Sequence, residues 1–411
     1  MIKRTIYPQI VKAIQNRPVV LITGARQVGK STLCKKIIQD YNFNYVSLDD
    51  IRERQMALND PEMFLQIHKW PLIIDEVQYA PKLFEVIESL VNKEKIETGK
   101  NYGMFVLTGS QTYNLMEGVS ESMAGRASII KMSPLSKSEI NQVVEKPFTI
   151  NLEENFKRTS VYQINVDELY ESIVKGFYPE LYDNENLDSN QYYSDYIDTY
   201  INKDVSQIIN LKDKLKFQNF MEVLASLTGE ELVYDSIAKT IGMSVMTIQS
   251  WVSVLVAADI IYLLRPYNEN SVLKRVVKRP KIYFKDTGLA CYLSRLNNKD
   301  VLKTSRFNGR FVETYIINEI MKSYLNNGKT PNFFYYRDSD QKKIDLIILD
   351  EGKLNLIECK SGVSFKLSDV NSFETLKKKT NYQVDKCCII CNTPKLYSLK
   401  KDVLVLPLSA I

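Results

Sequence analysis

Histidine is almost missing from this sequence of 411 residues, where His68 is its single occurrence. This scarcity argues against most histidine-based catalytic triads and against metal sites built from several histidines. The six cysteines show neither the spacing of a disulfide scaffold nor paired CxxC zinc knuckles. We therefore expect a reducing, intracellular compartment. Internal repeats and low-complexity tracts are missing as well.

Long hydrophobic runs are also missing. The first residues, MIKRTIYPQI, have no apolar core, which argues against a signal peptide. The most apolar stretch, Val252 to Leu264, contains Asp259 and is shorter than the roughly 20 residues that span a bilayer. These patterns predict a soluble cytoplasmic protein that does not associate with membranes.

The charge balance is only mildly basic. There are 54 Lys and Arg residues against 49 Asp and Glu residues, which gives a net charge of +5. This balance permits nucleic-acid binding without arguing for it, because a local basic patch matters more than the total. The length predicts two or three domains, each large enough to bury a core.

Short apolar runs alternate with helical patterns in the first third of the chain. The runs are Val19–Thr23, Tyr45–Leu48, Leu72–Asp75 and Met104–Thr108. This alternation predicts an α/β domain in which crossover helices connect the strands of a parallel sheet.

We divide the chain into four segments. Residues 1–135 are expected to form the parallel-sheet domain, and residues 136–216 a polar, Tyr-rich helical lid or linker. Residues 217–285 have a helical and then strand-like pattern, which predicts a winged-helix-like unit. Residues 286–411, with a long helix, a strand hairpin and further short strands, predict a separate C-terminal α/β domain.

The strongest motif follows the first apolar run and matches the pattern GxxxxGK[ST]. Its residues are Gly24, Ala25, Arg26, Gln27, Val28, Gly29, Lys30, Ser31 and Thr32. Glycines let the backbone curl so that successive N–H groups face one point, and the following helix adds its positive dipole end there. We expect Lys30 to reach the outer phosphates of ATP and the Ser31 hydroxyl to bind Mg²⁺. The alternative is an ordinary glycine-containing turn between strand and helix.

A second motif, Pro71-Leu-Ile-Ile-Asp75-Glu76, ends an apolar run with two carboxylates. A buried parallel strand would deliver both acids to the edge of the sheet at which ligands bind. Asp75 is then expected to hold Mg²⁺, and Glu76 to polarise the attacking water. Alone, the motif would more simply be a strand end with solvated acids.

Three further positions could complete this site. Ser110, or alternatively Thr108 or Gln111, could contact the γ-phosphate from the end of another strand. Arg126 could be an arginine finger, acting within its own subunit or across a subunit boundary, or it could form a surface salt bridge. The acids Asp49 and Asp50 end the second strand, where they either border the site or lie in a solvated turn.

Residues 235–255 have the pattern of a helix-turn-helix unit, with a tight turn at Gly242 and Ser244 as the N-cap of the second helix. Its recognition face would offer Thr247, Gln249 and Ser250, so a purely structural three-helix unit is an equal alternative. A basic run follows around a β wing, and it could contact phosphates or be a solvated hairpin. The run consists of Lys274, Arg275, Lys278, Arg279 and Lys281.

Two acids face each other on a predicted hairpin in the last segment. A two-residue turn at Glu351-Gly352 would pair residues whose numbers sum to about 703, so Asp345 would lie opposite Glu358. Both faces of the hairpin are apolar, and two opposed acids are costly in an interior strand. A divalent cation bound by Asp345 and Glu358 would relieve the repulsion and could activate water. Lys360 and Glu313 would complete a nuclease-like centre, and the alternative is a salt-bridged strand end.

The sequence resembles prokaryotic AAA-type P-loop ATPases that carry a C-terminal domain of unknown function similar to the PD-(D/E)xK restriction-endonuclease fold. The resemblance covers nearly the whole chain. It rests on these segments: Gly24–Thr32, Leu48-Asp-Asp, Ile74-Asp-Glu-Val-Gln78, Leu107-Thr-Gly-Ser, Ala124-Gly-Arg126, Gly176-Phe-Tyr-Pro179, Tyr200-Ile-Asn-Lys-Asp204-Val, Tyr283-Phe-Lys-Asp-Thr-Gly-Leu289, Gly309-Arg-Phe-Val-Glu313, Tyr335-Tyr-Arg-Asp, Ile344-Asp345 and Glu358-Cys-Lys360-Ser. It implies ATP binding, and it implies a nuclease-like fold whose chemistry can be retained or lost.

Together these features predict a Mg²⁺-dependent ATPase that associates with DNA and carries a nuclease-like C-terminal domain. Oligomerisation is compatible with the sequence. The alternative is a signalling or scaffold ATPase whose C-terminal domain binds a protein partner.

Overall fold

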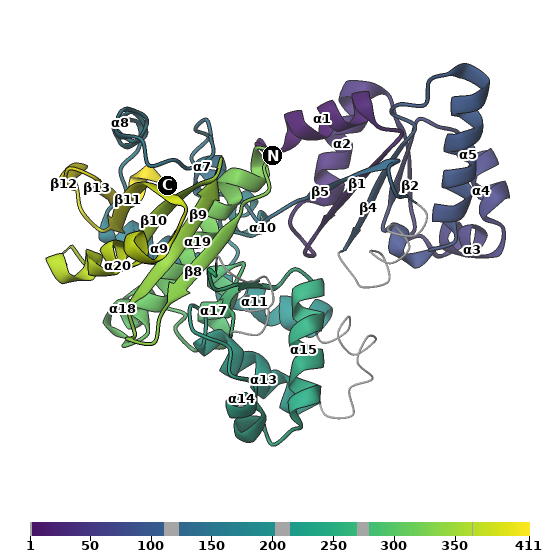
Figure 1. Ribbon diagram of the computed structural model, residues 1–411. Coiled ribbons are helices and arrows are strands. Elements are labelled where there is room, and N and C mark those ends of the chain that lie inside the picture. Colours follow the sequence, from purple (N-terminus) through teal and green to yellow (C-terminus); the bar gives the residue numbers. More distant parts are fainter. Residues whose placement is uncertain (1, 111–122, 202–213, 269–278, 364) are drawn as a thin grey trace.

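The computed structural model describes residues 2–110, 123–201, 214–268, 279–363 and 365–411. Three units follow one another along the chain (Figure 1). The N-terminal unit, in purple and blue, and the C-terminal unit, in green and yellow, lie side by side. The teal helices labelled α13, α14 and α15 (residues 214–257) lie below both of them in this view, whereas α7, α8 and α9 (residues 137–175) lie beside the C-terminal unit.

The N-terminal unit is built on a parallel sheet that, in the described part of the chain, has the strand order β2-β3-β4-β1-β5. Its strands are β1 (Val19–Gly24), β2 (Asn44–Ser47), β3 (Leu72–Asp75), β4 (Phe105–Ser110) and β5 (Ala127–Lys131). Every adjacent pair is parallel. The predicted parallel sheet is therefore confirmed, and the half-exposed edge strand β5 is an addition that the sequence did not reveal.

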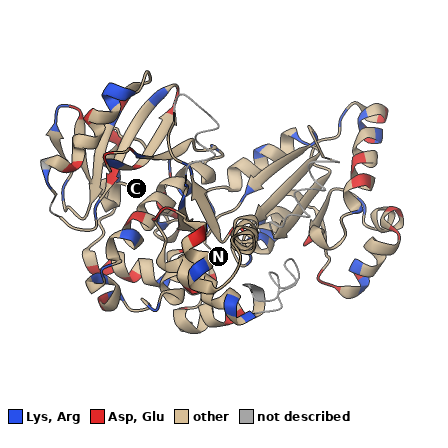
Figure 2. Cartoon of the chain, turned by 60° about the horizontal axis from the view of Figure 1, so that its bottom comes forward, with Lys and Arg blue, Asp and Glu red and all other residues tan. Residues whose placement is uncertain are grey.

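Helices cover both faces of this sheet and carry most of the unit's charges. They are α1 (Tyr7–Asn16), α2 (Lys30–Tyr41), α3 (Ile51–Asn59), α4 (Pro61–Ile67) and α5 (Leu83–Thr98), together with the 3-10 turn η1 (Val77–Tyr79). In Figure 2 the strands of this sheet are almost entirely uncharged, whereas blue and red segments are frequent on the helices. The strands β1, β3 and β4 are buried because apolar residues occupy both of their faces.

The middle of the chain is helical before it forms a small sheet. Its elements are α7 (Lys137–Ile140), α8 (Leu152–Val161), α9 (Val166–Lys175), α10 (Glu180–Asp183), α11 (Ser189–Tyr196), the π-helical η2 (Ile197–Ile201), α13 (Lys214–Ser226), α14 (Tyr234–Ile241), α15 (Val245–Ala257), β6 (Ile261–Leu264) and β7 (Lys281–Phe284). Strands β6 and β7 pair in antiparallel orientation. Helix α9 packs against α17 and α18 (residues 287–304), the two helices that follow β7. The segment that contains α9 is therefore in contact with the C-terminal half of the chain.

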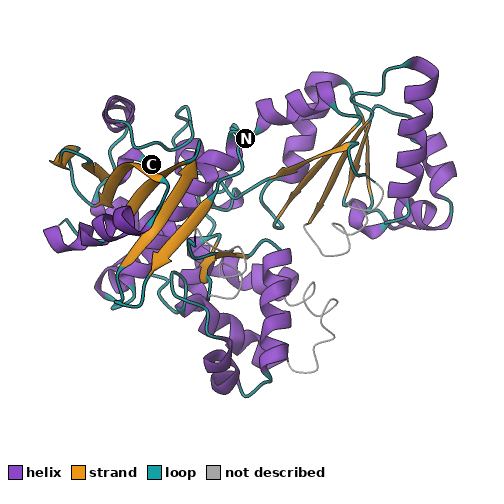
Figure 3. Ribbon diagram, viewed as in Figure 1, coloured by secondary structure: helices purple, strands orange, loops and turns teal. Residues whose placement is uncertain are grey.

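The C-terminal unit contains a mixed sheet between helices. Its helical elements are α17 (Thr287–Leu293), α18 (Lys299–Thr304), α19 (Asn308–Asn326), η3 (Leu367–Val370), α20 (Asn371–Lys379) and η4 (Leu408–Ala410). Its strands are β8 (Phe333–Arg337), β9 (Lys343–Asp350), β10 (Lys353–Cys359), β11 (Gln383–Cys391), β12 (Tyr397–Lys400) and β13 (Val403–Pro407), in the order β12-β13-β11-β10-β9-β8 among the described residues. Helices and strands of all three units can be compared in Figure 3.

The predicted hairpin register is confirmed. Strands β9 and β10 are antiparallel with Lys353 opposite Asp350 and Ile357 opposite Leu346. The next step of this register brings Asp345 and Glu358 to the same end of the two strands. Strand β10 continues the sheet through a parallel contact with β11, so the hairpin lies in the interior of the sheet as its two apolar faces predicted.

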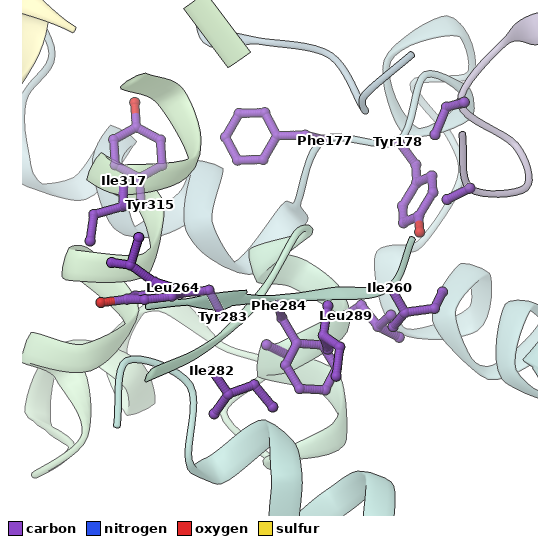
Figure 4. Close-up of a cluster of buried hydrophobic side chains, with 14 of the residues drawn as sticks. Phe177, Tyr178, Ile260, Leu264, Ile282, Tyr283, Phe284, Leu289, Tyr315 and Ile317 are labelled. Atoms are coloured by element: carbon purple, nitrogen blue, oxygen red, sulfur yellow. The ribbon is translucent and has the colours of Figure 1, made fainter. Parts of the chain in front are cut away.

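One hydrophobic core connects the units. It contains buried residues of α1 and β1, of the helices α9 to α15, and of α17, α19 and the C-terminal sheet. In Figure 4, Phe177, Ile260 and Ile282 lie around the same cluster as Tyr315 and Ile317 of α19. This shared core places the middle unit in direct contact with its neighbours.

Among the described helices, none has on its own both the length and the apolar character for crossing a membrane. The pair α14 and α15 meets these criteria only jointly, and it is bent by 106°.

Candidate functional site

The GxxxxGK[ST] motif, residues 24–32, connects β1 to α2 at the carboxyl edge of the parallel sheet. We call it the phosphate loop. Gly24 has a φ of 151°, and a Cβ atom there would lie 2.2 Å from the carbonyl oxygen of Met132. Gly29 has a φ of 95° and is the N-cap of α2, with no side chain capping the helix. Only glycine combines this close approach and this left-handed conformation at low cost. The first N–H groups of α2 are thus left for an anion.

The Lys30 side chain is folded back onto this loop. Its Nζ donates hydrogen bonds to the carbonyl oxygens of Gly24, at 3.1 Å, and Ala25, at 2.8 Å. Burial lowers the pKa of Lys30, while the nearby carboxylate of Glu76 acts in the opposite direction. The ammonium group therefore lies inside the loop, held by carbonyl oxygens that an incoming phosphate would replace.

The two predicted acids lie at the same edge of the sheet. Asp75 is buried at the end of β3, where it accepts hydrogen bonds from the hydroxyl groups of Thr108 and, at 2.9 Å, Tyr45. Glu76 follows with a left-handed φ of 58°, and its N–H donates to Thr108 Oγ1 at 3.3 Å. The left-handed residue turns the chain sharply away from the strand. Asp75, Glu76 and the phosphate loop are therefore brought together as the sequence predicted.

Gln78 links Glu76 to the end of β4, and sequence reasoning gave it no role. Its amide nitrogen donates to Glu76 Oε2 and, at 3.2 Å, to Ser110 Oγ. Ser110 is buried, so the predicted residue does lie beside the acids, but its contact is with Gln78. Gln78 Oε1 is buried without a hydrogen-bond partner. The sequence Asp75-Glu-Val-Gln78 was the available signal for this role, because it places Gln78 only two residues after Glu76. The turn η1 then brings the Gln78 side chain back toward Glu76.

Residues distant in the sequence support the phosphate loop from outside. The buried Arg4 donates hydrogen bonds of 2.7 Å to the carbonyl oxygens of Val28 and Ser133. Tyr192 of α11 donates its hydroxyl proton to Gln27 Oε1 at 2.6 Å. The loop is therefore in contact with the chain N-terminal to α1 and with a helix of the middle unit.

A cavity of about 380 Å³ opens beside the phosphate loop and the first turns of α2. Its lining is mostly apolar and includes Tyr7, Gly29, Thr32, Leu33 and Pro179. The cavity thus adjoins the positions at which the loop would hold a phosphate chain.

A second polar cluster lies at the end of the hairpin in the C-terminal unit. Asp345 and Glu358 are 1% and 2% exposed, and Glu313 of α19 joins them. Lys281 of β7 donates to Glu313 Oε1 at 2.7 Å and lies 3.7 Å from Asp345 Oδ1. Lys360 lies 3.1 Å from Glu358 Oε1. The structure therefore brings the four predicted residues of the nuclease-like centre together, and it adds Lys281.

The charges in this cluster perturb one another. Burial, with repulsion from Asp345, raises the pKa of Glu358 to about 8, although Lys360 opposes the change. Burial also raises the pKa of Glu313. At Lys281 burial acts to lower the pKa, but Glu313 and Asp345 outweigh it and raise the pKa above its usual range. Lys281 was predicted to be part of a basic wing, and this prediction was wrong because its ammonium group is buried among carboxylates.

The helix-turn-helix pattern of the middle unit is present in α14 and α15. Gly242 ends α14 with a φ of 68°, and Ser244 Oγ accepts a hydrogen bond from the N–H of Thr247 at 3.1 Å. Gln249 and Ser250 are exposed on α15. Three residues of the predicted basic wing, Lys274, Arg275 and Lys278, lie outside the described residues, as does Gln111 of the first unit.

Three families of known domains match successive parts of the chain. Residues 16–141 match an AAA domain, residues 166–300 a domain of unknown function (DUF8612), and residues 308–411 another domain of unknown function (DUF4143). The first match covers the phosphate loop, Asp75 and Glu76. Residues 16–141 form an AAA-type P-loop ATPase domain.

Curated relatives extend this similarity beyond the ATPase domain. The chain is 24% identical over 354 residues to the "Uncharacterized protein Rv2008c" of Mycobacterium tuberculosis, in an alignment that covers 85% of this chain and 72% of the relative. It is 26% identical over 309 residues to the "Uncharacterized protein MJ1637" of Methanocaldococcus jannaschii, covering 67% and 63% respectively. Among solved structures, the Walker-type ATPase PABY2304 of Pyrococcus abyssi is 14% identical, with a TM-score of 0.43, and covers 70% of this chain and 94% of its own.

Arg126 is not at the phosphate loop of its own ATPase domain. It precedes β5, which runs parallel to β1, so it lies at the opposite edge of the sheet. Its guanidinium group lies 3.0 Å from Glu88 Oε1 and donates to Asn92 Oδ1 at 2.9 Å. The salt bridge considered as the alternative is therefore the arrangement present. An action across a subunit boundary stays a prediction.

The acids after β2 do not form part of the phosphate site either. Asp50 is the N-cap of α3, where its side chain accepts a hydrogen bond from the N–H of Arg52 at 2.9 Å. Asp49 lies 3.9 Å from the guanidinium group of Arg54. Both acids are exposed, as expected for a solvated turn.

Proposed function

We propose that the chain binds ATP and hydrolyses it to ADP and phosphate with the help of Mg²⁺. The observation that carries this proposal is the meeting of the phosphate loop with Asp75 and Glu76 at one edge of the sheet. Ligands bind at the carboxyl ends of parallel strands in open α/β sheets, and the N–H groups at the start of α2 add a site for anions.

The residues at this edge fit a nucleotide with its metal ion. Lys30 would exchange the carbonyl oxygens of Gly24 and Ala25 for phosphate oxygens, and its charge would follow the outer phosphates. Ser31 is exposed at the start of α2, and together with Asp75 it offers the oxygen ligands that Mg²⁺ prefers. The ion would neutralise charge on the phosphates during transfer.

Glu76 is placed to act on the attacking water. The water oxygen would attack the γ-phosphorus as the bond to the β-phosphate oxygen breaks, while the Glu76 carboxylate orients the water through a hydrogen bond. Gln78, bonded to both Glu76 and Ser110, would hold this carboxylate and report the presence of the γ-phosphate to the end of β4.

The cavity beside the loop would take the base and sugar of the nucleotide. Its volume of about 380 Å³ and its apolar lining from Tyr7, Leu33 and Pro179 suit a planar heterocycle. Because Gly29 and Thr32 lie in the same lining, a base in the cavity and phosphates on the loop can belong to one molecule.

We further infer that ATP turnover is coupled to DNA. This inference is supported by the helix-turn-helix arrangement of α14 and α15 beside the sheet of β6 and β7, which suits a winged-helix-like module. The mixed C-terminal sheet, with Asp345 and Glu358 at the end of one hairpin, fits the expected restriction-endonuclease-like fold. A fold of this kind does not by itself imply cleavage.

A signalling or scaffold ATPase that binds a protein partner is favoured by one specific observation. The exposed residues at the start of α15 are Met246, Gln249 and Ser250, and none of them carries a positive charge. A helix that enters a DNA groove is usually accompanied by cationic side chains that contact phosphates. An exposed Met is instead common at adaptable protein-binding surfaces.

Measurements of ATP binding and turnover test the proposal. Calorimetry should show binding of ATP with Mg²⁺, and release of phosphate should follow. Addition of duplex DNA at low salt should raise the rate if the DNA coupling is correct. An absence of nucleotide binding would refute the ATPase assignment. Nucleotide binding without any DNA affinity would leave the protein-partner function instead.

A further inference from the structure

The acidic cluster of the C-terminal unit contains a positively charged side chain of the protein itself, Lys281. Glu313 comes from α19, Asp345 from β9 and Glu358 from β10, whereas Lys281 comes from β7 of the middle unit. All four residues are buried. The Lys281 ammonium group is 2.7 Å from Glu313 Oε1 and 3.7 Å from Asp345 Oδ1.

The arrangement of donors around these acids does not fit a divalent metal ion. Within the described ranges, no group of three or more His, Cys, Asp or Glu side chains converges closely enough to hold one. Asp345 Oδ2 accepts a hydrogen bond from the N–H of Cys359 at 3.0 Å, and Glu313 Oε1 also accepts the hydroxyl proton of Tyr283 at 2.6 Å. Protein groups thus already contact Glu313 and Asp345, and the Lys281 ammonium group lies 2.7 Å from the first carboxylate and 3.7 Å from the second.

Two carboxylate oxygens in the cluster nevertheless lack a hydrogen-bond donor. Asp345 Oδ1 and Glu358 Oε2 are buried without a hydrogen-bond partner. A buried unpaired carboxylate oxygen is costly, and a divalent cation bound between Asp345 and Glu358 in place of Lys281 would remove that cost. Lys360 neutralises only the other oxygen of Glu358, at 3.1 Å.

We propose that Lys281 is a resident counter-ion that closes this cluster to divalent cations. Its ammonium group and a metal ion would compete for the same carboxylates, so only one of them can be bound at a time. Because Lys281 belongs to β7, metal binding requires that β7 move away from α19. The position of the middle unit and the occupancy of the acidic cluster are then linked, and each must influence the other equally.

Removal of the lysine should therefore create a metal site. In Lys281→Met, a side chain of similar length replaces the ammonium group. The cations that remain near the three carboxylates are Lys360, 3.1 Å from Glu358 Oε1, and the exposed Lys343, 3.8 Å from Asp345 Oδ1. Without nucleotide, we expect this full-length variant to bind one Mn²⁺ at least about tenfold more tightly than any site in the wild type, and Mn²⁺ to raise its melting temperature. Free Mn²⁺ is counted by electron paramagnetic resonance, and unfolding is followed by calorimetry.

Two further variants separate the site from background binding. Lys281→Met combined with Glu358→Gln should lose the new Mn²⁺ site, because one of its ligands is gone. Lys281→Arg keeps the positive charge and should gain no site. If Lys281→Met does not fold, the double variant Lys281→Met with Glu313→Gln decides, because it removes the ion pair as a whole and keeps Asp345 and Glu358.

Two results would overturn the inference. The first is a wild-type protein that already binds Mn²⁺ at a site abolished by Glu358→Gln, since Lys281 would then not exclude the metal. The second is a folded variant without Lys281 that gains no Mn²⁺ binding. Neither result depends on nucleotide binding, so the outcome is independent of the proposed ATPase function.

Discussion

Individual charged residues at the phosphate loop have separable tasks. Lys30 has both of its hydrogen bonds with the loop itself, whereas Glu76 contacts Gln78 and Thr108 on the neighbouring strand and turn. Under the proposed function, the lysine would belong to the binding surface and the glutamate to the groups that act on bound nucleotide. Substitutions at these two positions should affect different steps.

Lys30→Ala should abolish detectable ATP binding in calorimetry, because it removes the cation inside the loop. Glu76→Gln should bind ATP with nearly unchanged affinity and lower the turnover number by roughly 10²- to 10³-fold. The exposed Lys35 lies on the same helix as Lys30, and Lys35→Ala should leave both properties unchanged. Equal effects of the Lys30 and Lys35 variants would show that net charge, not position, determines binding.

Glu145 provides a pH dependence that is independent of nucleotide. Burial, with repulsion from Glu139, raises the pKa of Glu145 from 4.5 to about 7. Between these pH values the folded state binds more protons than the unfolded state, so stability falls as the pH rises from 4.5 to 7.

Glu145→Gln removes this titration and retains an acceptor for the hydrogen bond from Asn326. The variant should be more stable than the wild type at pH 8 by roughly 1–3 kcal/mol, and the difference should shrink toward pH 4.5. Urea unfolding at several pH values measures it. The exposed Glu153→Gln is the control, and an equal gain there would contradict the assignment to Glu145.

At the scale of elements, the turn between α14 and α15 depends on one hydroxyl group. Ser244 Oγ caps α15 through the N–H of Thr247, and Gly242 ends α14 in a left-handed conformation. Ser244→Ala should lower the free energy of unfolding by about 1 kcal/mol, as loss of an N-cap does elsewhere. Ser244→Thr keeps a hydroxyl group and should retain most of the stability. A comparison of chemical unfolding curves decides, and equal losses in both variants would exclude capping as the cause.

The helices and strands of this protein differ in how well they can be predicted from the sequence. The buried strands β1, β3 and β4 were predictable, because continuous apolar runs end in Gly24, in Asp75 and in Ser110. The register of β9 and β10 was also predictable, because a short turn at Glu351 and Gly352 determines every pair in the hairpin. Strand β5 was missed, since its residues are half-exposed and show no continuous apolar run.

Contacts between distant segments could not be derived in this way. Lys281 lies in a run of basic residues, and the sequence shows neither its burial nor its ion pair with Glu313. Arg4 and Tyr192 reach the phosphate loop from 24 and 165 residues away in the sequence. Pairings of this kind follow from packing of the whole chain, and local periodicity carries no information about them.

At the scale of the whole molecule, Asp259 joins the ATPase domain to the middle unit. This buried residue follows α15, and its Oδ1 lies 2.6 Å from Lys131 Nζ at the end of β5 and also contacts Lys285 Nζ. Its Oδ2 has no hydrogen-bond partner. Burial lowers the pKa of Lys285 to about 8, while Asp259 opposes the change. One carboxylate thus contacts two ammonium groups from separate parts of the chain.

Asp259→Asn should destabilise the protein by about 3 kcal/mol or more, because it leaves the buried Lys285 without its charged partner. Lys131→Met removes only the connection to β5 and should cost less. Differential scanning calorimetry should show the ATPase domain melting separately in Asp259→Asn, whereas the wild type melts in one transition. A single, unshifted transition in this variant would show that Asp259 does not join the units.

The hydrogen bond between Tyr192 and Gln27 gives the protein an optical property. The ring of Tyr192 lies 5.6 Å from that of Tyr178, which lies 5.0 Å from that of Tyr196, so a group of mutually tilted phenol rings begins at the phosphate loop. Only two tryptophans are present in the sequence, and they leave the emission of these phenols comparatively visible. Any rearrangement of the loop around an arriving molecule changes the surroundings of the first phenol. Arrival can therefore be timed by ultraviolet fluorescence in a stopped-flow instrument, without attaching a dye.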